Sequence, residues 1–491
     1  MFPRFVNITC FIVFSLVIFY LCHGVFFGQF RTDDGFFIQS SWNILNQLMN
    51  PIDVYIPAGY PYLLSKGLMA FNYDLDYFFY VRFFNLLIAI FLLFYLSKLI
   101  IGTIGDNPIY IVFSYLISFL CLIYLISMRG FEIRPESIGN LFLVLSFCYI
   151  FNTFTSRCNE GFYYYLSVIF SILTAFMSTR YVLPVSFVWL ASTLKYWNFK
   201  GYELKELTKV IGVAIVLSMT LFFLFHDIND VTVAIDRASE INDNREPLSM
   251  YDKAFSIGFG KFHYLSKFNY LEGYRVSLYL FFLLTCVSAF FCKIQNYERT
   301  IISVLLFSNI LTIVFLFFID FRPFNYAVTH EFILLFVSFL SVLKIVNNRI
   351  YSLIFLSIFC VFLLYFYSPA KKVIEENHPK LSGFFSSSND LDDSVIQNLK
   401  AEDVFSLRFN SGIGYSAKYQ IKLMKKICNL YPGEDVYAFS IRYDKHPMCM
   451  KDEYTYDYFI GKSSYDLVYR QVTTYNNLLY QDENYLIYKK E

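Results

Sequence analysis

Long apolar segments, separated by short polar ones, run through the first three quarters of the chain. About 20 consecutive apolar residues cross the hydrocarbon core of a bilayer as a helix, so we expect about eleven membrane-spanning helices here. They are expected near residues 7–27, 78–97, 108–127, 137–154, 161–177, 181–197, 208–225, 276–292, 300–319, 326–343 and 350–367. The fifth and sixth segments lie close together, which suggests that one of them is short or re-entrant.

The last part of the chain, residues 368–491, has a different pattern. Its apolar runs are short, and charged, Asn, Ser and Tyr residues are common. Residues 435–442 and 483–489 alternate as strands do, and 402–430 contains helix-like stretches. About 120 residues suffice for a small domain with its own core. The expected fold is therefore mainly α: a polytopic transmembrane helix bundle over 1–367 with a small C-terminal α/β extramembrane domain over 368–491.

The composition agrees with a membrane protein. Of all residues, 57% are hydrophobic and only 16% are charged, which excludes a soluble globular protein. The first segment has the apolar core of a secretory signal peptide. It continues through Phe26 and Phe27 with no small-residue cleavage site, so we expect a retained membrane helix.

Basic residues in short loops indicate the orientation of a membrane protein. A cytoplasmic N-terminus places the basic cluster 195–209 inside, whereas the reverse orientation places it outside, so the first is favoured. The loop 28–77 and the C-terminal region 368–491 then lie on the outer face.

An acidic pair, Asp33 and Asp34, follows the first apolar segment. Ionised carboxylates are costly near hydrocarbon, so a pair at a membrane boundary suggests a site. Residues 36–49 follow with the spacing of an amphipathic helix suited to the membrane surface. A polar cap on a membrane helix is the other interpretation, and both stay open at this point.

Basic residues recur in the other segments assigned to the outer face. Arginine suits a lipid-linked phosphate, which it can bind bidentately. The candidates for binding a donor phosphate are Lys66, Arg129, Arg134, Arg180 and Arg322. Each can equally be a snorkelling or capping residue, since Pro135 and Glu136 suit the first turn of a helix.

The net charge and the cysteine positions bear on nucleic-acid binding, metal binding and disulfide formation. The net charge of +1 gives no reason to expect a nucleic acid. The cysteines form no CxxC or Cys/His cluster, so no metal site is predicted from them. Cys428 and Cys449 lie in the polar C-terminal region and can form a disulfide if that region faces an oxidising compartment.

The order of these features resembles the GT-C class of integral-membrane glycosyltransferases, which includes protein O-mannosyltransferases and lipid A aminoarabinose transferases. The motifs are Thr32-Asp33-Asp34-Gly35-Phe36 after the first span, Arg134-Pro135-Glu136 at the fourth, and Arg322 with Tyr326 before a late span. The resemblance implies a polyprenyl-phosphate-sugar donor and inverting transfer of its sugar to an acceptor hydroxyl. The acceptor would be a glycolipid, a lipopolysaccharide or a surface polymer.

The resemblance also implies roles. Asp33 corresponds to the general base, and Asp34 would orient it, hold the acceptor or help bind a divalent cation where a family member uses one. A carboxylate can remove the hydroxyl proton, and fixed cations stabilise the leaving phosphate. Glu136 and Tyr326 would support the site. The implied location is a bacterial inner membrane, with the site and the C-terminal domain on the periplasmic side.

Two motifs of related families are absent from the chain, and two other functions stay open. The chain has neither the His-rich loop of some protein mannosyltransferases nor a WWD-like motif, which makes a protein acceptor doubtful. A membrane transporter or lipid flippase is the alternative function, although charges within spans are few and no internal repeat is seen. A further alternative function is that of a non-enzymatic partner of a polymerase or ligase. Residues 368–491 would then be its docking module.

Overall fold

The computed structural model describes the chain in segments. They are residues 2–27, 37–38, 41, 44–45, 59–72, 77–128, 130–151, 160–225, 269–318, 328–377, 458–462, 477–481 and 485–489, apart from some side chains near helix ends. Asp33, Asp34, Arg129, Arg322 and Tyr326 lie outside the described residues, as do the two candidate disulfide cysteines.

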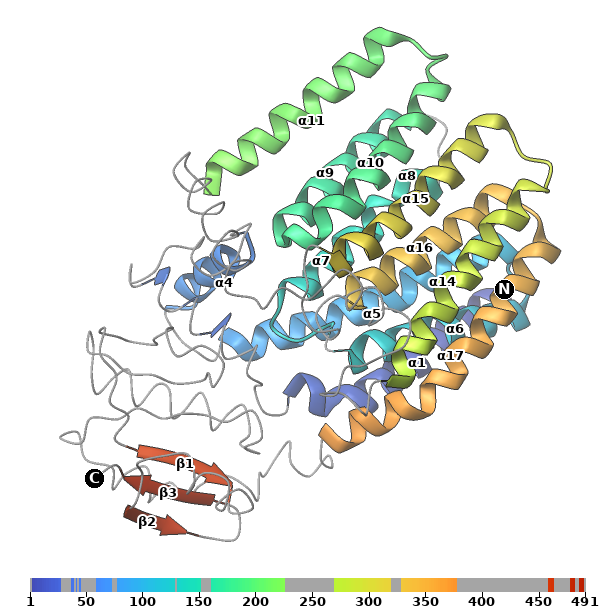
Figure 1. Cartoon of the computed structure of the whole chain (residues 1–491). Coiled ribbons are helices and arrows are strands. Elements are labelled where there is room, and N and C mark those ends of the chain that lie inside the picture. The colour runs from blue at the N-terminus through green and yellow to red at the C-terminus, as the bar shows by residue number, and fades with distance from the viewer. Residues whose placement is uncertain are drawn as a thin grey trace. The chain divides into compact units, whose positions relative to one another are not determined.

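The described part is mainly helical, as the apolar pattern predicts (Figure 1). The helices are α1 (Phe2–Phe27), α4 (Gly59–Ala70), α5 (Tyr77–Ile104), α6 (Pro108–Ser127), α7 (Pro135–Ser146), α8 (Cys148–Phe151), α9 (Glu160–Met177), α10 (Thr179–Phe199), α11 (Leu204–Phe225), α14 (Asn269–Phe290), α15 (Asn296–Phe318), α16 (Val328–Val346) and α17 (Arg349–Asn377). Three short strands are β1 (Tyr458–Lys462), β2 (Asn477–Gln481) and β3 (Tyr485–Lys489).

Each segment expected to span the membrane contains a helix, although the fourth is divided into α7 and α8 by a turn at Phe147. Within the described residues, 4 helices are long and apolar enough to cross a membrane: Phe2–Cys22, Tyr77–Ile104, Pro108–Ser127 and Arg349–Tyr367. This is compatible with an integral membrane protein. The count of eleven crossings stays a prediction.

The chain divides into two compact units. Unit 1 comprises Met1–Tyr20, Leu87–Gly130 and Pro135–Val373, and unit 2 comprises Leu21–Leu86, Phe131–Arg134 and Ile374–Glu491. Each is described below by itself.

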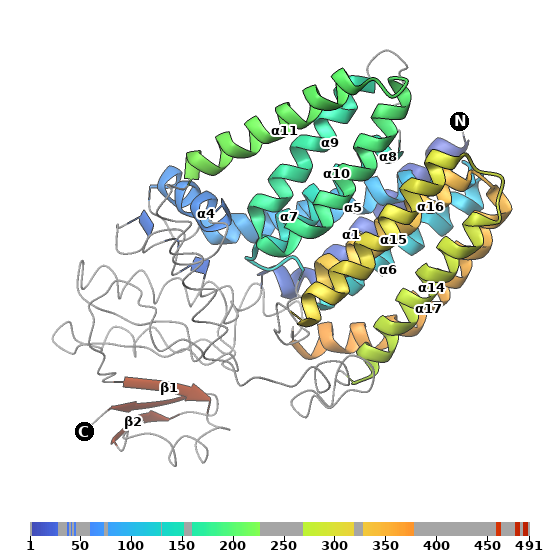
Figure 2. The same cartoon turned by 45° about the horizontal axis from the view of Figure 1, so that its top comes forward.

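In unit 1, α10 packs between α9 and α15, and α7 packs on α9 (Figures 1 and 2). α16 contacts α7, α14 and α15. Its Phe332 stacks on Tyr124 of α6, with ring centroids 4.0 Å apart, and Tyr124 also contacts Phe366 of α17. Aromatic side chains therefore form much of this core, which accounts for part of the chain's large Phe and Tyr content.

Polar side chains join the helices of unit 1 at several places. The hydroxyls of Tyr164 and Thr193 lie 2.9 Å apart between α9 and α10. The Asn309 amide on α15 donates to Ser338 Oγ on α16 at 3.1 Å. Hydrogen bonds of this kind are typical of helix contacts in apolar surroundings, where water offers no alternative partner.

Contacts at the helix ends show that two consecutive pairs in unit 1, α5 with α6 and α16 with α17, turn back at the same end. At one end, Lys344 near the end of α16 donates to the carbonyl of Gly102 near the end of α5, at 3.0 Å. Here Arg349, which begins α17, lies 4.6 Å from the ring of Tyr110 in the first turn of α6. The opposite end gathers the starts of α7, α10 and α16, described below.

Unit 2 contains α4, the start of α5 and the strands. α4 occupies part of the segment 28–77, which is expected to be a loop. Gly59 and Pro61 are typical of turns, but Pro61 lies in the first turn of the helix, where proline is tolerated. A Cβ at Gly67 would lie 2.1 Å from the hydroxyl of Tyr77, so only glycine lets this ring lie against α4.

The strands form an antiparallel sheet in the order β1-β3-β2. β3 falls within residues 483–489, where alternation predicts a strand. The other expected strand, 435–442, and the helix-like stretch 402–430 lie outside the described residues. The α/β character and the boundaries of a C-terminal domain therefore stay predictions.

Candidate functional site

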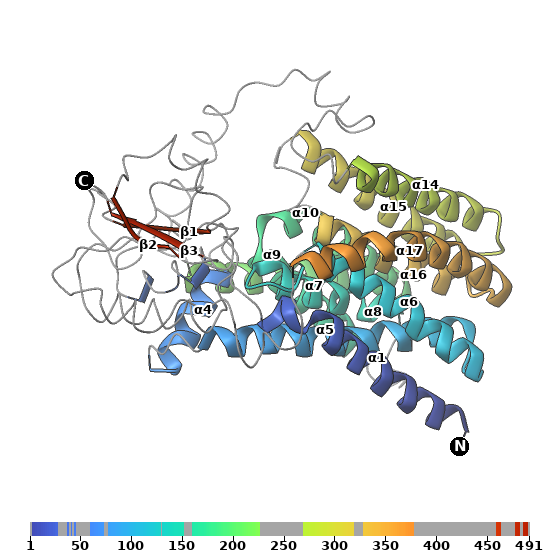
Figure 3. The ribbon, with the colours of Figure 1, turned by 90° about the horizontal axis from the view of Figure 1, so that it is seen from below.

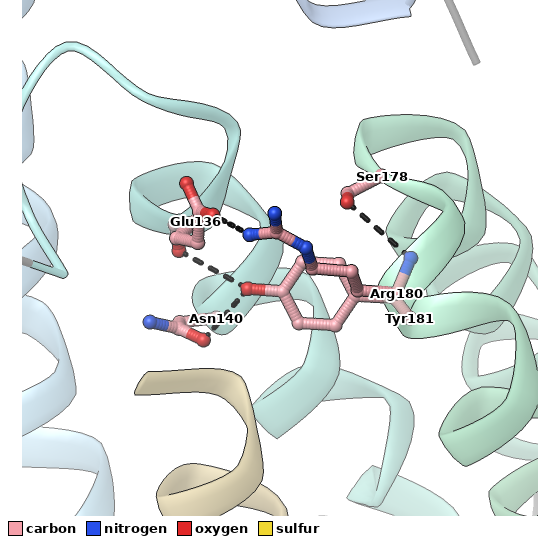
Figure 4. A network of polar contacts seen from close by, with 5 residues as sticks. All are labelled: Glu136, Asn140, Ser178, Arg180 and Tyr181. Atoms are coloured by element: carbon pink, nitrogen blue, oxygen red, sulfur yellow. Dashed lines mark hydrogen bonds and ion pairs between the residues drawn. The ribbon is translucent and has the colours of Figure 1, made fainter. Parts of the chain in front are cut away.

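A buried ion pair joins α7 to α10 in unit 1 (Figure 4). The Arg180 Nη1 donates to Glu136 Oε1 at 3.1 Å, and the two side chains are only 5% and 3% exposed. Burying a charge in an apolar bundle is costly unless the charge is paired. This pair therefore identifies a place in unit 1 that the sequence keeps polar despite its surroundings.

Local sequence explains why both charges stand at helix starts. Pro135 opens α7, and Glu136 follows in the first turn, where a carboxylate interacts favourably with the helix dipole. Ser178 is the N-cap of α10, with its hydroxyl accepting from the Arg180 backbone N–H at 3.4 Å. The two helix starts thus bring residues 44 positions apart into contact.

Tyr181 extends the network on α10. Its hydroxyl donates to Asn140 Oδ1 at 2.8 Å, and the Glu136 carbonyl lies 3.5 Å from the same hydroxyl (Figure 4). A Cβ at Gly139 would lie 2.5 Å from the Tyr181 ring. The absence of a side chain at Gly139 therefore lets the ring lie against α7 with its hydroxyl beside Asn140.

The start of α16 reaches the same cluster. The rings of Tyr181 and His330 make an edge contact with centroids 5.2 Å apart. His330 and Glu331, in the first turn of α16, are both buried. Three helix N-termini with Glu136, Asn140, Arg180, Tyr181 and His330 form what we call the polar cluster of unit 1.

A second group of buried polar residues lies in unit 2. Arg82 and Asn85 stand one turn apart on α5, and both are buried together with Glu132 and Arg134. The Glu132 carbonyl accepts from the Asn85 amide at 2.9 Å and from the Arg134 backbone N–H at 2.8 Å. These bonds hold the segment 131–134 against the face of α5 that carries Arg82.

The candidate residues from the sequence fall into different environments. Arg134, Glu136 and Arg180 are buried, and the contact of Glu136 with Arg180 joins two of them. Lys66 is exposed on α4, with its ammonium 5.2 Å from the ring of Tyr62. For Asp33 and Asp34, which lie outside the described residues, the structure gives no test.

Sequence reasoning missed Asn140, Ser178 and Asn85. Asn140 stands four residues after Glu136, on the same face of α7, and an Asn in an apolar helix favours a polar contact. Ser178 directly precedes the helix that carries Arg180, which is the signal of an N-cap. The sequence thus indicates a polar contact for Asn140 and a cap at Ser178, but the partner of Asn140, Tyr181, depends on the packing of α7 against α10.

No metal centre is found among the described residues, since none of their His, Cys, Asp and Glu side chains form a group of three that could hold an ion. The polar cluster instead combines helix N-termini with an arginine whose guanidinium is oriented by a carboxylate. Helix N-termini and arginine both favour anions, and phosphate groups in particular. No family model matches the chain, and no curated protein or solved structure matches it either.

Proposed function

We propose that this chain is an integral-membrane glycosyltransferase that moves a sugar from a polyprenyl-phosphate donor to an acceptor hydroxyl, with inversion at the sugar carbon. The observation that carries the proposal is the buried contact of Glu136 with Arg180. Glu136 belongs to the Arg134-Pro135-Glu136 motif of the GT-C resemblance, and Arg180 is an independent candidate for the donor phosphate.

The burial of Glu136 and Arg180 supports a substrate-binding site rather than a purely structural role. Ionisable residues in apolar helix bundles are expensive, and they typically mark substrate sites. The described part of unit 1 places such residues at the starts of three helices at one end. A helix-capping role would need only the carboxylate of Glu136, whereas the arginine beside it has no capping function at a helix N-terminus, because the dipole there disfavours a cation.

In the proposed reaction, Arg180 binds the donor phosphate. Glu136 orients the guanidinium of Arg180, which lowers the entropy lost when a phosphate oxygen is bound. The apolar polyprenyl chain would lie between helices, within the bilayer.

The transfer moves one proton, forms one bond to the sugar carbon and breaks another. Asp33 accepts the acceptor hydroxyl's proton while that oxygen forms a bond to the anomeric carbon of the sugar. The bond from this carbon to the phosphate oxygen breaks, and the phosphate leaves with the electron pair and the negative charge. Fixed cations near that oxygen stabilise the developing charge. Asp34 orients Asp33 or the acceptor.

The test is transfer by the purified full chain in nanodiscs, with a panel of polyprenyl-phosphate sugars and glycolipid acceptors, read by mass spectrometry. We expect one donor to give product, and Asp33→Asn to lower the rate by about 10²- to 10⁴-fold, as is typical of losing a general base. The matched control is Asp106→Asn, because Asp106 is exposed in the turn between α5 and α6. It should transfer at the rate of the unmodified protein.

One outcome would overturn the role of Asp33, and another would overturn the function. Full activity of Asp33→Asn would eliminate Asp33 as the base while leaving the function intact. No product from any donor, together with flux of a lipid or solute across liposomes, would favour a transporter or flippase instead.

A further inference from the structure

A cavity of about 500 Å³ lies in unit 1, at the opposite end from the polar cluster. It is formed by the connection from α14 to α15 and the connection from α16 to α17, which lie at the same end of the helices (Figures 1 and 3). Its lining residues are Cys292, Lys293, Val346, Asn347, Asn348, Arg349 and Ile350. His330 and Val346 are about 24 Å apart along α16 at 1.5 Å per residue, so this cavity is separate from the polar cluster.

The charged residues of the lining are both basic, Lys293 and Arg349. Two acidic residues stand in the turns at this end of the helices: Asp106 is exposed, and the carboxylate of Glu298 accepts from the Gln295 backbone N–H at 2.8 Å. Among the described residues, neither Lys293 nor Arg349 has an ion-pair partner. The cavity therefore offers positive charge and amide groups to a ligand, which suits an anion.

Local structure fixes the position of Arg349. Its guanidinium carbon lies 4.6 Å from the centre of the Tyr110 ring. Asn348 caps α17, because its Oδ1 accepts from the backbone N–H groups of Ile350 and Tyr351, both at 3.1 Å. Asn347 has a left-handed backbone conformation, with a φ of 47°, which turns the chain between α16 and α17. An arginine held in this way is organised before a ligand arrives.

An apolar stripe begins at the cavity. Ile350 lines it and is 72% exposed, and Ile354, Ile358 and Val361 follow on α17 at 53%, 42% and 66% exposed. Their spacing of four, four and three residues places them on one face of the helix. This face belongs to a segment, Arg349–Tyr367, that is long and apolar enough to cross a membrane. A ligand with an anionic head and an apolar tail fits a basic pocket continued by such a stripe.

We propose that this pocket binds the phosphate of an anionic phospholipid, whose acyl chain lies along the stripe of α17. Basic pockets between membrane helices are suited to such head groups. The proposal does not depend on the glycosyltransferase function, because it uses none of the residues assigned to donor or acceptor.

The experiment is native mass spectrometry of the delipidated full chain in a neutral detergent, titrated with dioctanoyl phosphatidylglycerol, dioctanoyl phosphatidylcholine or sodium phosphate. We expect phosphatidylglycerol, which is anionic, to bind more tightly than phosphatidylcholine, which has no net charge. Lys293→Gln should weaken its binding about 5-fold, and Lys293→Gln with Arg349→Gln about 25-fold, from the typical contribution of each basic residue near a membrane surface. The control pair is Lys205→Gln with Lys209→Gln, exposed residues of α11 that remove equal charge away from the pocket.

Equal binding of the two lipids, or equal weakening by the control pair, would overturn the proposal. Competition by sodium phosphate at the concentration where the lipid binds would reject the lipid as the source of the phosphate. If the double variant does not fold because the ring contact of Arg349 is lost, Lys293→Gln alone decides the result, since it leaves that contact in place.

Discussion

The ion pair of Glu136 with Arg180 leads to a quantitative prediction about stability. A double-mutant cycle with Glu136→Gln, Arg180→Gln and the double variant measures the coupling of the two side chains. At 3.1 Å the direct Coulomb attraction is about 5 kcal/mol for an effective dielectric constant of 20. Removing one partner of a buried pair typically costs about 3–5 kcal/mol, because the other charge stays buried.

We therefore expect each single variant to lower the free energy of unfolding by about 3 kcal/mol. The double variant should cost less than the sum, with a coupling energy of about 2–3 kcal/mol, because it leaves no unpaired charge. The assay is unfolding by SDS in mixed micelles, followed by the fluorescence of Trp189 and Trp197, which both lie on α10.

Glu203→Gln and Arg299→Gln are the controls, since both side chains are exposed. Each should change the free energy of unfolding by less than about 0.5 kcal/mol. A coupling energy below about 0.5 kcal/mol between Glu136 and Arg180 would refute the reasoning, because it would mean that other groups compensate each charge independently.

Two other substitutions test the packing of unit 1. Gly139→Ala should lower the free energy of unfolding by about 1–3 kcal/mol, because the new methyl would meet the Tyr181 ring at 2.5 Å, whereas Gly102→Ala, which meets nothing within 4 Å, should be neutral or stabilising in the same SDS titration. Lys195→Met should cost about 1–3 kcal/mol, because Lys195 donates to the carbonyls of Tyr149 at 2.8 Å and Ile150 at 3.0 Å at the end of α8. Lys205→Met, at an exposed position, is the matched control; equal losses for the two lysines would show that these hydrogen bonds contribute little.

The helices were predictable because an apolar segment in hydrocarbon must satisfy its backbone hydrogen bonds internally. Length and hydropathy therefore indicate helices without knowledge of their neighbours. The pattern failed where local signals conflict with packing. At α4, Gly59 and Pro61 indicate a turn, yet the helix forms, and its Gly67 lets the Tyr77 ring approach. The break at Phe147 is likewise absent from the hydropathy pattern.

The candidate site was predictable in its residue types and less so in its contacts. Glu136 was identified from the Arg134-Pro135-Glu136 motif, and Arg180 as a basic residue in a segment assigned to the outer face. Their pairing was not, because a separation of 44 residues leaves the partner to the packing of α7 and α10. Asn140 and Tyr181 join the same network through a glycine, Gly139, whose role is visible only when the two helices are placed together.

Burial separates two kinds of arginine that the sequence presents alike. Arg180 and Arg349 both occur at the start of apolar helices, and either is consistent with a residue that only sets membrane orientation. Arg180 is 5% exposed and paired with a carboxylate, whereas Arg349 is exposed and lies over an aromatic ring beside a basic pocket. An orientation signal needs only a charge near the surface, so neither environment is required for it. The buried pair is suited to holding a guanidinium in one orientation for a substrate, and the exposed arginine to meeting an anion at the membrane boundary. The buried pair and the exposed pocket therefore differ in physical setting, and an experiment that rejects the role of one leaves the role of the other standing.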